Sequence, residues 1–149
     1  MESLQSAAPP WAPGEASYRS LAESIPGALL RYTFHADGRE SAEALSSRCL
    51  ALWELPPLKI AEDATRLWDM VDVTELDALR ASLWRAAASR SPWQAEWQIT
   101  TPSGRRKWLQ GSGQPECQLD GSVVWHLVVL DVSERKRAEQ ALHISEARF

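Results

Sequence analysis

Cysteine, membrane-length apolar runs and catalytic signatures are scarce or absent in this chain of 149 residues. Its two cysteines, Cys49 and Cys117, lie far apart, and neither has a second cysteine or a histidine at metal-ligand spacing. We therefore expect reduced thiols and no metal site. No apolar run approaches the ~18 residues of a membrane span, and the N-terminus lacks the basic and apolar regions of a signal peptide. These absences indicate a cytoplasmic segment without a membrane partner, whatever a longer parent protein contains.

Motifs for catalysis and for nucleic-acid binding are also missing. The sequence has no Gly-rich phosphate loop, no Gly-x-Ser-x-Gly, no His-Glu-x-x-His and no kinase signature, so we expect no enzyme in this segment. The net charge of −4 and pI near 5.4 argue against a binder of phosphate backbones. Two short basic clusters, at 105–107 and 135–137, are interpreted as solvated faces, which predicts no nucleic-acid partner.

What is present indicates one globular α+β domain, since 44% of the residues are apolar. Prolines and a glycine predict a flexible leader over 1–15, followed by a short helix over 16–24 that could cover the sheet. Strands are expected at 28–34 and 40–45, helices near 46–55, 61–70 and 72–89, and three further strands separated by turns at 103–104 and 120–121. This order predicts an antiparallel sheet packed on helices.

The last predicted strand, 123–132, is apolar on both faces, which indicates that both faces are covered. One face would meet the helices. The other would need the N-terminal helix or a second subunit, because a soluble monomer rarely exposes such a patch. Dimerisation through the sheet is therefore a hypothesis.

The tail runs from that strand directly into a charged helix without Gly or Pro. Ser133 is a candidate N-cap, and Glu134 lies in the first turn, where the helix dipole favours an anion. A seam of Arg135, Ala138, Leu142, Ser145 and Phe149 has coiled-coil spacing but spans only two heptads. A solvated helix and a dimer stalk both remain open. The pattern continues to the last residue, so we expect the helix to lead to a downstream output domain.

The sequence Asp131-Val132-Ser133-Glu134-Arg135-Lys136 is similar to the Asp-Ile-Thr-Glu-Arg-Lys signature that closes PAS domains in bacterial sensor proteins. Other segments resemble parts of the family's sequence, in the same order along the chain. Residues 24–27 resemble the entry to the first strand, and residues 36–39 resemble the first hairpin turn. Residues 96–109 resemble the family's Glu-Tyr-Arg-Ile, Asp-Gly and Trp-Val-Glu sequence, and residues 119–122 resemble its last turn. The likeness covers 18–136. The sequence departs from the pattern at 71–74, where His-Pro-Asp-Asp is usual, and at Gln98, where Arg is usual.

The resemblance implies a PAS-like five-stranded antiparallel sheet with helices packed on one face, plus an N-terminal cap helix and a C-terminal signalling helix. It divides the chain into a leader (1–15), a PAS sensory domain with its cap helix (16–135) and a linker helix (136–149). It also implies a sensory and dimerisation module of a sensor histidine kinase or a diguanylate cyclase. Asp131, with Ser133, Glu134 and Arg135, would then couple the domain to its output.

The resemblance also implies a small cavity between helices and sheet, and the chain is rich in tryptophan, with eight residues. Trp53, Trp68, Trp84 and Trp97 are candidates to line it, and so is His126. They would suit a small apolar or aromatic ligand. Core packing is the alternative explanation for each tryptophan, and a hydrogen-bonded core position for the histidine.

The cofactor cannot be identified from the sequence. Haem-binding PAS domains usually present an axial histidine from the long helix or its flanking loop. The resemblance therefore disfavours haem here, because the histidines, at positions 35, 126 and 143, lie outside the long helix over 72–89. Covalent flavin chemistry is disfavoured because Cys49 does not stand in the Asn-Cys-Arg-Phe-Leu context of flavin photosensors, whereas non-covalent flavin stays open. Two other functions stay open: a ligand-free scaffold that only dimerises or positions an output domain, and a small α+β enzyme that uses His126 and a neighbouring carboxylate in an open polar cleft.

Overall fold

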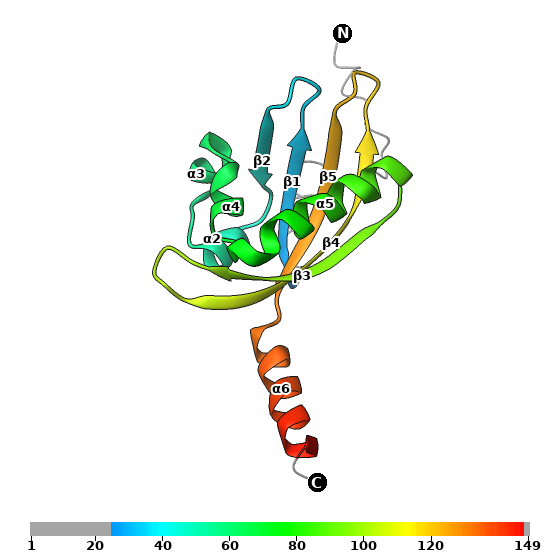
Figure 1. The fold of residues 1–149 in the computed structure, drawn as a ribbon. Coiled ribbons are helices and arrows are strands. Elements are labelled where there is room, and N and C mark those ends of the chain that lie inside the picture. Colours follow the sequence, from blue (N-terminus) through cyan, green and yellow to red (C-terminus); the bar gives the residue numbers. More distant parts are fainter. Residues whose placement is uncertain (1–24, 148–149) are drawn as a thin grey trace, which may run out of the picture.

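The structure, a computed structural model, describes residues 25–147. The leader and the helix predicted over 16–24 lie outside these residues. The elements follow the order β1 (Ala28–Phe34), β2 (Glu40–Ala44), α2 (Arg48–Trp53), α3 (Pro57–Glu62), α4 (Thr65–Asp69), α5 (Val73–Ser89), β3 (Trp93–Thr100), β4 (Arg106–Cys117), β5 (Val123–Asp131) and α6 (Ser133–Ala147). The strands form one antiparallel sheet in the order β2-β1-β5-β4-β3 (Figure 1). The predicted α+β fold is confirmed.

Strand β5 lies at the centre of the sheet, between β1 and β4. Its odd-numbered residues from Trp125 to Val129 are buried on the face that the helices cover. The alternate residues from Val124 to Leu130 face the other way and are half-buried or exposed, as the alternation of a strand requires. We call these the inner and the outer face of the sheet.

Helix α5 crosses the inner face, as Figure 1 shows. Asp72 is its N-cap, and its carboxylate accepts a hydrogen bond from the Thr74 N–H at 3.1 Å, which is one of the free donors of a first helical turn. Leu79, Leu83 and Ala87, spaced four residues apart, are the buried side chains of the helix. They hold α5 against the sheet.

The single helix predicted over 61–70 is wrong, because two short helices occupy this region. Pro57 does not only end the preceding helix: it also stands at the first position of α3, where its missing N–H and fixed φ are tolerated. Asp63 then leaves the helical conformation, with φ −153°, and its carboxylate accepts hydrogen bonds from the backbone and hydroxyl of Thr65. That contact starts α4 in a new direction.

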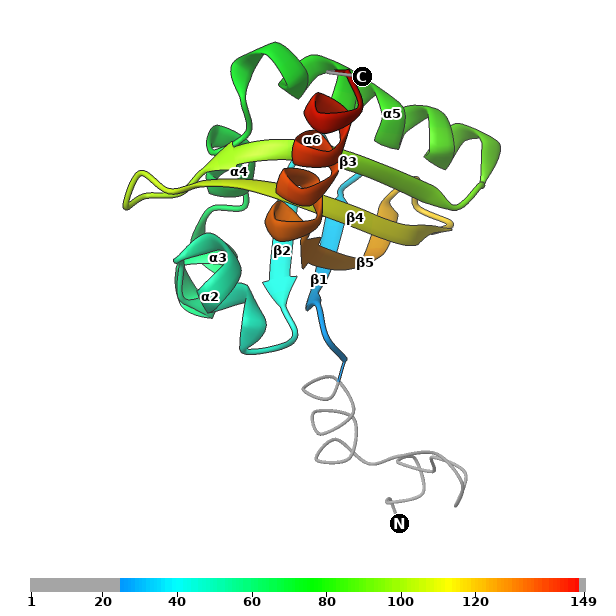
Figure 2. The same ribbon diagram turned by 90° about the horizontal axis from the view of Figure 1, so that it is seen from below.

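Helix α6 leaves the sheet directly after β5 and projects away from it (Figures 1 and 2). The described residues contain no helix that is both long and apolar enough for a bilayer span.

Candidate functional site

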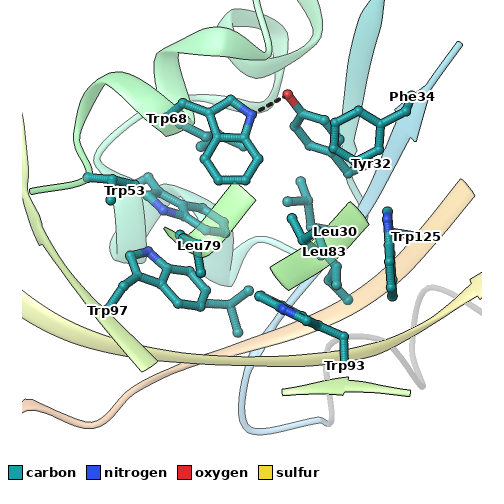
Figure 3. Close-up of a pocket in the computed structure, with 14 residues that line it drawn as sticks. Leu30, Tyr32, Phe34, Trp53, Trp68, Leu79, Leu83, Trp93, Trp97 and Trp125 are labelled. Atoms are coloured by element: carbon teal, nitrogen blue, oxygen red, sulfur yellow. Dashed lines mark hydrogen bonds between the residues drawn. The ribbon is translucent and has the colours of Figure 1, made fainter. Parts of the chain in front are cut away.

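A cavity lies between the inner face of the sheet and the helices. Fourteen residues line it: Leu30, Tyr32, Phe34, Trp53, Leu67, Trp68, Val71, Leu79, Leu83, Trp93, Trp97, Trp125, Leu127 and Val129 (Figure 3). The space open to the centre of a water-sized sphere is about 40 Å³. That holds a few water molecules, whereas pockets for drug-sized ligands measure roughly 300–1,000 Å³. The aromatic rings therefore fill most of the room that a flat ligand would need.

The cavity does not fit haem or a covalent flavin in this conformation. Its lining contains neither a histidine to ligate iron nor a cysteine to bond a flavin ring, and its volume is too small for either group. A ligand larger than a few atoms would have to displace tryptophan rings.

Three of the four predicted tryptophans line the cavity, namely Trp53, Trp68 and Trp97. Trp84 does not: it is 49% exposed and packs against Phe34, with ring centroids 4.6 Å apart. Its position explains the difference, since it follows the buried Leu83 by one residue, or about 100° around the helix. The expectation that Trp84 lines the cavity is wrong.

The sequence reasoning missed two further lining tryptophans, Trp93 and Trp125. The signal was available, because strand alternation places Trp93 on the same face as Trp97, and Trp125 on the face of Leu127. The rings of Trp93 and Trp97 lie over Gly111 of β4, where an added Cβ would come within 3.0 Å of both. A glycine at this point leaves room for the two rings against the β4 backbone.

His126 does not reach the cavity. It lies on the outer face, exposed, and its Nε2 is 3.0 Å from the Glu116 carboxylate. The reason is again alternation, because its neighbours Trp125 and Leu127 both point inward. His126 is therefore neither a cavity ligand nor the core residue that was the alternative.

A polar network closes the cavity near β2. The Trp68 indole donates to the Tyr32 hydroxyl at 2.6 Å (Figure 3), and that hydroxyl donates to Glu40 at 2.6 Å. Arg80 holds the same carboxylate with two nitrogens and stacks over the Trp68 ring at 4.6 Å. The network joins β1, β2, α4 and α5 around one charge pair.

This arrangement perturbs two pKa values. Burial, reinforced by the bond to Glu40, raises the pKa of Tyr32 well above its usual value, so it remains a neutral donor. Burial alone would raise the pKa of Glu40, but the hydrogen bonds from Arg80 and Tyr32 outweigh it and lower that pKa. Glu40 is therefore ionised at neutral pH.

The indole N–H groups of the cavity are not equally satisfied. Trp93 donates to the Ser82 hydroxyl at 2.8 Å, and Ser82 donates to the Leu79 carbonyl at 2.7 Å. The fully buried Trp125 N–H, in contrast, has no acceptor among residues 25–147. A buried donor without a partner costs about 1–3 kcal/mol, so Trp125 keeps an unsatisfied donor beside the cavity.

The second part of the site is the junction between β5 and α6. The Asp131 carboxylate accepts hydrogen bonds from the Ser133 N–H at 2.9 Å and from its hydroxyl at 2.5 Å. Ser133 Oγ in turn accepts the Trp108 N–H of β4 at 3.0 Å, and the Trp108 carbonyl accepts the Val132 N–H at 2.9 Å. The expected cap role of Ser133 thus belongs to Asp131, while Ser133 fixes the helix start to β4.

The first turns of α6 are also bound to the outer face of the sheet. Arg135 and Lys136 both pair with Glu96 of β3, the latter at 2.7 Å. The Lys136 ammonium lies 4.8 Å from the centre of the Trp108 ring, and the pKa of Glu96 is lowered first of all by its bond to Lys136. Sequence reasoning included Arg135 but missed Glu96, Trp108 and Lys136, because cross-strand partners carry no local sequence signal.

The remaining predicted coupling residue, Glu134, is exposed. Its side chain lines a polar depression together with Arg105, Arg106, Lys107, Asp131, Ser133 and Arg137. The junction therefore brings Asp131 and Ser133 into direct contact, whereas Arg135 pairs with Glu96 and Glu134 lines the depression.

Solved structures resemble this fold closely over most of the chain. A sensory box histidine kinase/response regulator from Burkholderia thailandensis matches with a TM-score of 0.68 and 22% identity, covering 87% of this chain and 95% of its own. The N-terminal domain of a diguanylate cyclase with a PAS/PAC sensor, from Marinobacter aquaeolei, matches with a TM-score of 0.59 and 9% identity. The match covers 72% of this chain and 98% of that domain. A light-oxygen-voltage domain studied with a flavin analogue matches with a TM-score of 0.59 and 15% identity. The match covers 87% of this chain and 94% of that domain.

No protein-family model matches the sequence, and the search of curated proteins found no match. The structural likeness is nevertheless consistent across these sensor domains, and it agrees with the resemblance read from the tail. The chain therefore has the fold of a PAS domain.

Proposed function

We propose that this chain is a non-enzymatic sensory module in which occupancy of the aromatic cavity changes how α6 is held at the Asp131–Ser133 junction. The observation that carries the proposal is this pairing of an apolar cavity with a helix start that is hydrogen-bonded to the sheet behind it. A ligand that binds one arrangement better than the other would shift the population between them. The helix would pass that shift to an output domain.

The chemistry of the lining restricts the ligand. Most of its surface is aliphatic or aromatic, and its polar groups are the Tyr32 hydroxyl and the tryptophan N–H groups. A neutral, largely apolar or aromatic molecule with an acceptor atom fits this lining. A charged ligand would lose its hydration without gaining a counterion.

The output domain would follow α6. Structural neighbours named as a histidine kinase and a diguanylate cyclase carry comparable domains, so we propose a kinase or a cyclase for this chain. This segment would contribute regulation rather than chemistry.

Native mass spectrometry and absorbance spectroscopy on freshly purified protein test the proposal. A sensor should carry a mass increment, or gain one from a library of small aromatic compounds, and binding should disappear when Leu83→Trp fills the cavity. The exposed Leu58→Trp is the matched control, since it adds the same ring outside the cavity. Binding that survives Leu83→Trp would contradict the proposed site.

The second candidate is a ligand-free scaffold that dimerises, and the small cavity volume favours it. The outer face of β5 offers Val124, Val128 and Leu130, all half-buried, as a surface for a second copy. The dimer would also use the N-terminal segment and α6. Analytical ultracentrifugation showing a monomer at high micromolar concentration would contradict this candidate.

A further inference from the structure

We propose that Lys107 is a positioning residue that couples the aromatic cavity to the start of α6. It holds the end of α2 on the inner face of β4, while its neighbour Trp108 holds Ser133 on the outer face. The inference rests on the proposed function, because it supplies the route between the cavity and the junction.

The environment of Lys107 is unusual for a lysine. The residue is 7% exposed, and its ammonium donates to the carbonyls of Ala51 at 2.9 Å and Leu52 at 2.8 Å. Within the described part of the chain it forms no ion pair. A buried cation is costly to desolvate, and an apolar side chain could fill the same space without that cost. The Lys107 charge also acts on the Glu54 carboxylate at the end of α2, so the ammonium contributes two hydrogen bonds and an electrostatic attraction to this end of the helix.

Those two carbonyls belong to the last turn of α2, where the carbonyls have no partners within the helix. The Glu54 N–H donates to the Leu50 carbonyl at 2.8 Å, and the Lys107 ammonium donates to the next two carbonyls of the helix. The Leu52 carbonyl is part of the same peptide group as the Trp53 nitrogen. Because the Trp53 side chain lines the cavity, a displacement of this ring that shifts the Trp53 backbone also moves the carbonyls that Lys107 holds.

The other side of β4 leads to α6. Successive residues of a strand point to opposite faces, so Lys107 points to α2 while Trp108 lies under α6. Trp108 contacts the helix in three ways: its N–H donates to Ser133 Oγ, its carbonyl accepts the Val132 N–H, and its ring lies under Lys136. Lys107, which contacts α2, and Trp108, which contacts α6, are thus joined by a single peptide bond of β4.

A second tie keeps the end of α2 next to β4. The Glu54 carboxylate accepts hydrogen bonds from the Ser103 N–H at 3.0 Å and hydroxyl at 2.9 Å, in the turn that joins β3 to β4. Since packed interiors are not freely compressible, α2 and this end of β4 move together, and Lys107 sets how closely.

Hydrogen exchange by NMR on the whole 149-residue chain tests the coupling without a ligand or an output domain. Trp53→Phe perturbs the cavity, and the Trp108 amide, which donates to Ser133, reports on the junction. We expect Trp53→Phe to change the exchange rate of this amide by about threefold or more, the lower part of the range for residues in one network. In a Lys107→Met background the same change should disappear.

Two further variants separate coupling from stability. Lys107→Arg keeps a multiple donor and should restore the response to Trp53→Phe. Lys59→Met, the loss of an exposed charge on α3 outside the junction, should leave the response intact. If Lys107→Met does not fold, the comparison is made between Lys107→Arg and Lys107→Gln, where the amide offers fewer hydrogens and should give the smaller response.

The proposal is overturned if the Trp108 amide responds equally to Trp53→Phe with and without the Lys107 donor, or does not respond in the wild-type chain. Either result would leave the ligand proposal standing, because mass spectrometry tests binding independently. Conversely, a chain that binds no ligand can still show this coupling.

Discussion

Replacing Tyr32 with Phe should destabilise the protein more than any other loss of a single hydroxyl near the cavity. The Tyr32 hydroxyl links the Trp68 indole to the Glu40 carboxylate through two bonds of 2.6 Å. A hydrogen bond to a charged group contributes about 1.5–3 kcal/mol, and a donor left without an acceptor costs about 1–3 kcal/mol. Trp68 is only half-buried, so water can partly replace its lost acceptor.

Allowing also for the desolvation that the phenol no longer suffers, we expect Tyr32→Phe to lower the free energy of unfolding by about 2 kcal/mol. For a domain of this size that is a fall in Tm of roughly 5–10 °C. Ser82→Ala is the matched control, because it removes the acceptor of another cavity indole, Trp93, without involving a charge. It should cost about 1 kcal/mol.

The pH dependence follows from the lowered pKa of Glu40. A carboxyl whose folded pKa lies below its ordinary value of 4.5 adds stability above pH 4.5, and this stability is lost as the pH falls through the folded pKa. Tyr32→Phe removes one of the donors that lower this pKa. The difference in unfolding free energy between the variant and the wild type should therefore become smaller below pH 4.5.

Urea denaturation at pH 7 and at several acidic pH values measures both effects. A penalty for Tyr32→Phe no larger than that for Ser82→Ala would refute the reasoning, because the Glu40 bond would then contribute nothing. A difference in unfolding free energy that stays constant at acidic pH would refute the conclusion that Tyr32 bonds to an ionised Glu40.

Three other changes probe the cavity and the junction. Trp125→Phe should lower the free energy of unfolding by less than about 3 kcal/mol, the lower end for truncating a buried tryptophan, because it also removes an unpartnered buried donor; a larger loss in urea denaturation would contradict that assignment. Gly111→Ala should destabilise the protein by about 1–3 kcal/mol and shift the tryptophan fluorescence, since the new methyl meets the Trp97 ring; an unchanged spectrum would show that the rings do not need this space. Glu96→Gln should speed amide exchange in the first turns of α6 about two- to fivefold with little change in overall stability. Glu139→Gln removes only the ion pair to Arg135 within the helix, 3.4 Å long, and should have a smaller effect; equal effects would argue against docking through Glu96.

Much of the fold could be predicted from the sequence because its signals are local. The Asp37-Gly38 turn, the Asp72 cap and the strict alternation of β3 each depend on neighbouring residues, and each agrees with the structure. The split between α3 and α4 was missed because it depends on one side-chain contact, from Asp63 to Thr65.

The site was predicted only in part, for a physical reason. Trp97 could be assigned to the inner face from a period of two, but Trp84 required the exact phase of a helix that exposes one side. Lys107 and Glu96 could not be assigned, because their partners lie about forty to fifty-five residues away in sequence. Contacts that join separate elements appear only when the fold brings those elements together.

The junction gives the most direct test of the proposed mechanism. Asp131→Ala removes the carboxylate that holds Ser133 at the start of α6, and Asp120→Ala removes the same kind of contact, to Ser122, at the distant β4–β5 turn. The measurement is the signalling output of the longer protein that we propose, with its output domain after α6, and the folding of each variant is checked by circular dichroism. The account predicts that Asp131→Ala changes the output while Asp120→Ala does not; an unchanged output from folded Asp131→Ala would contradict it.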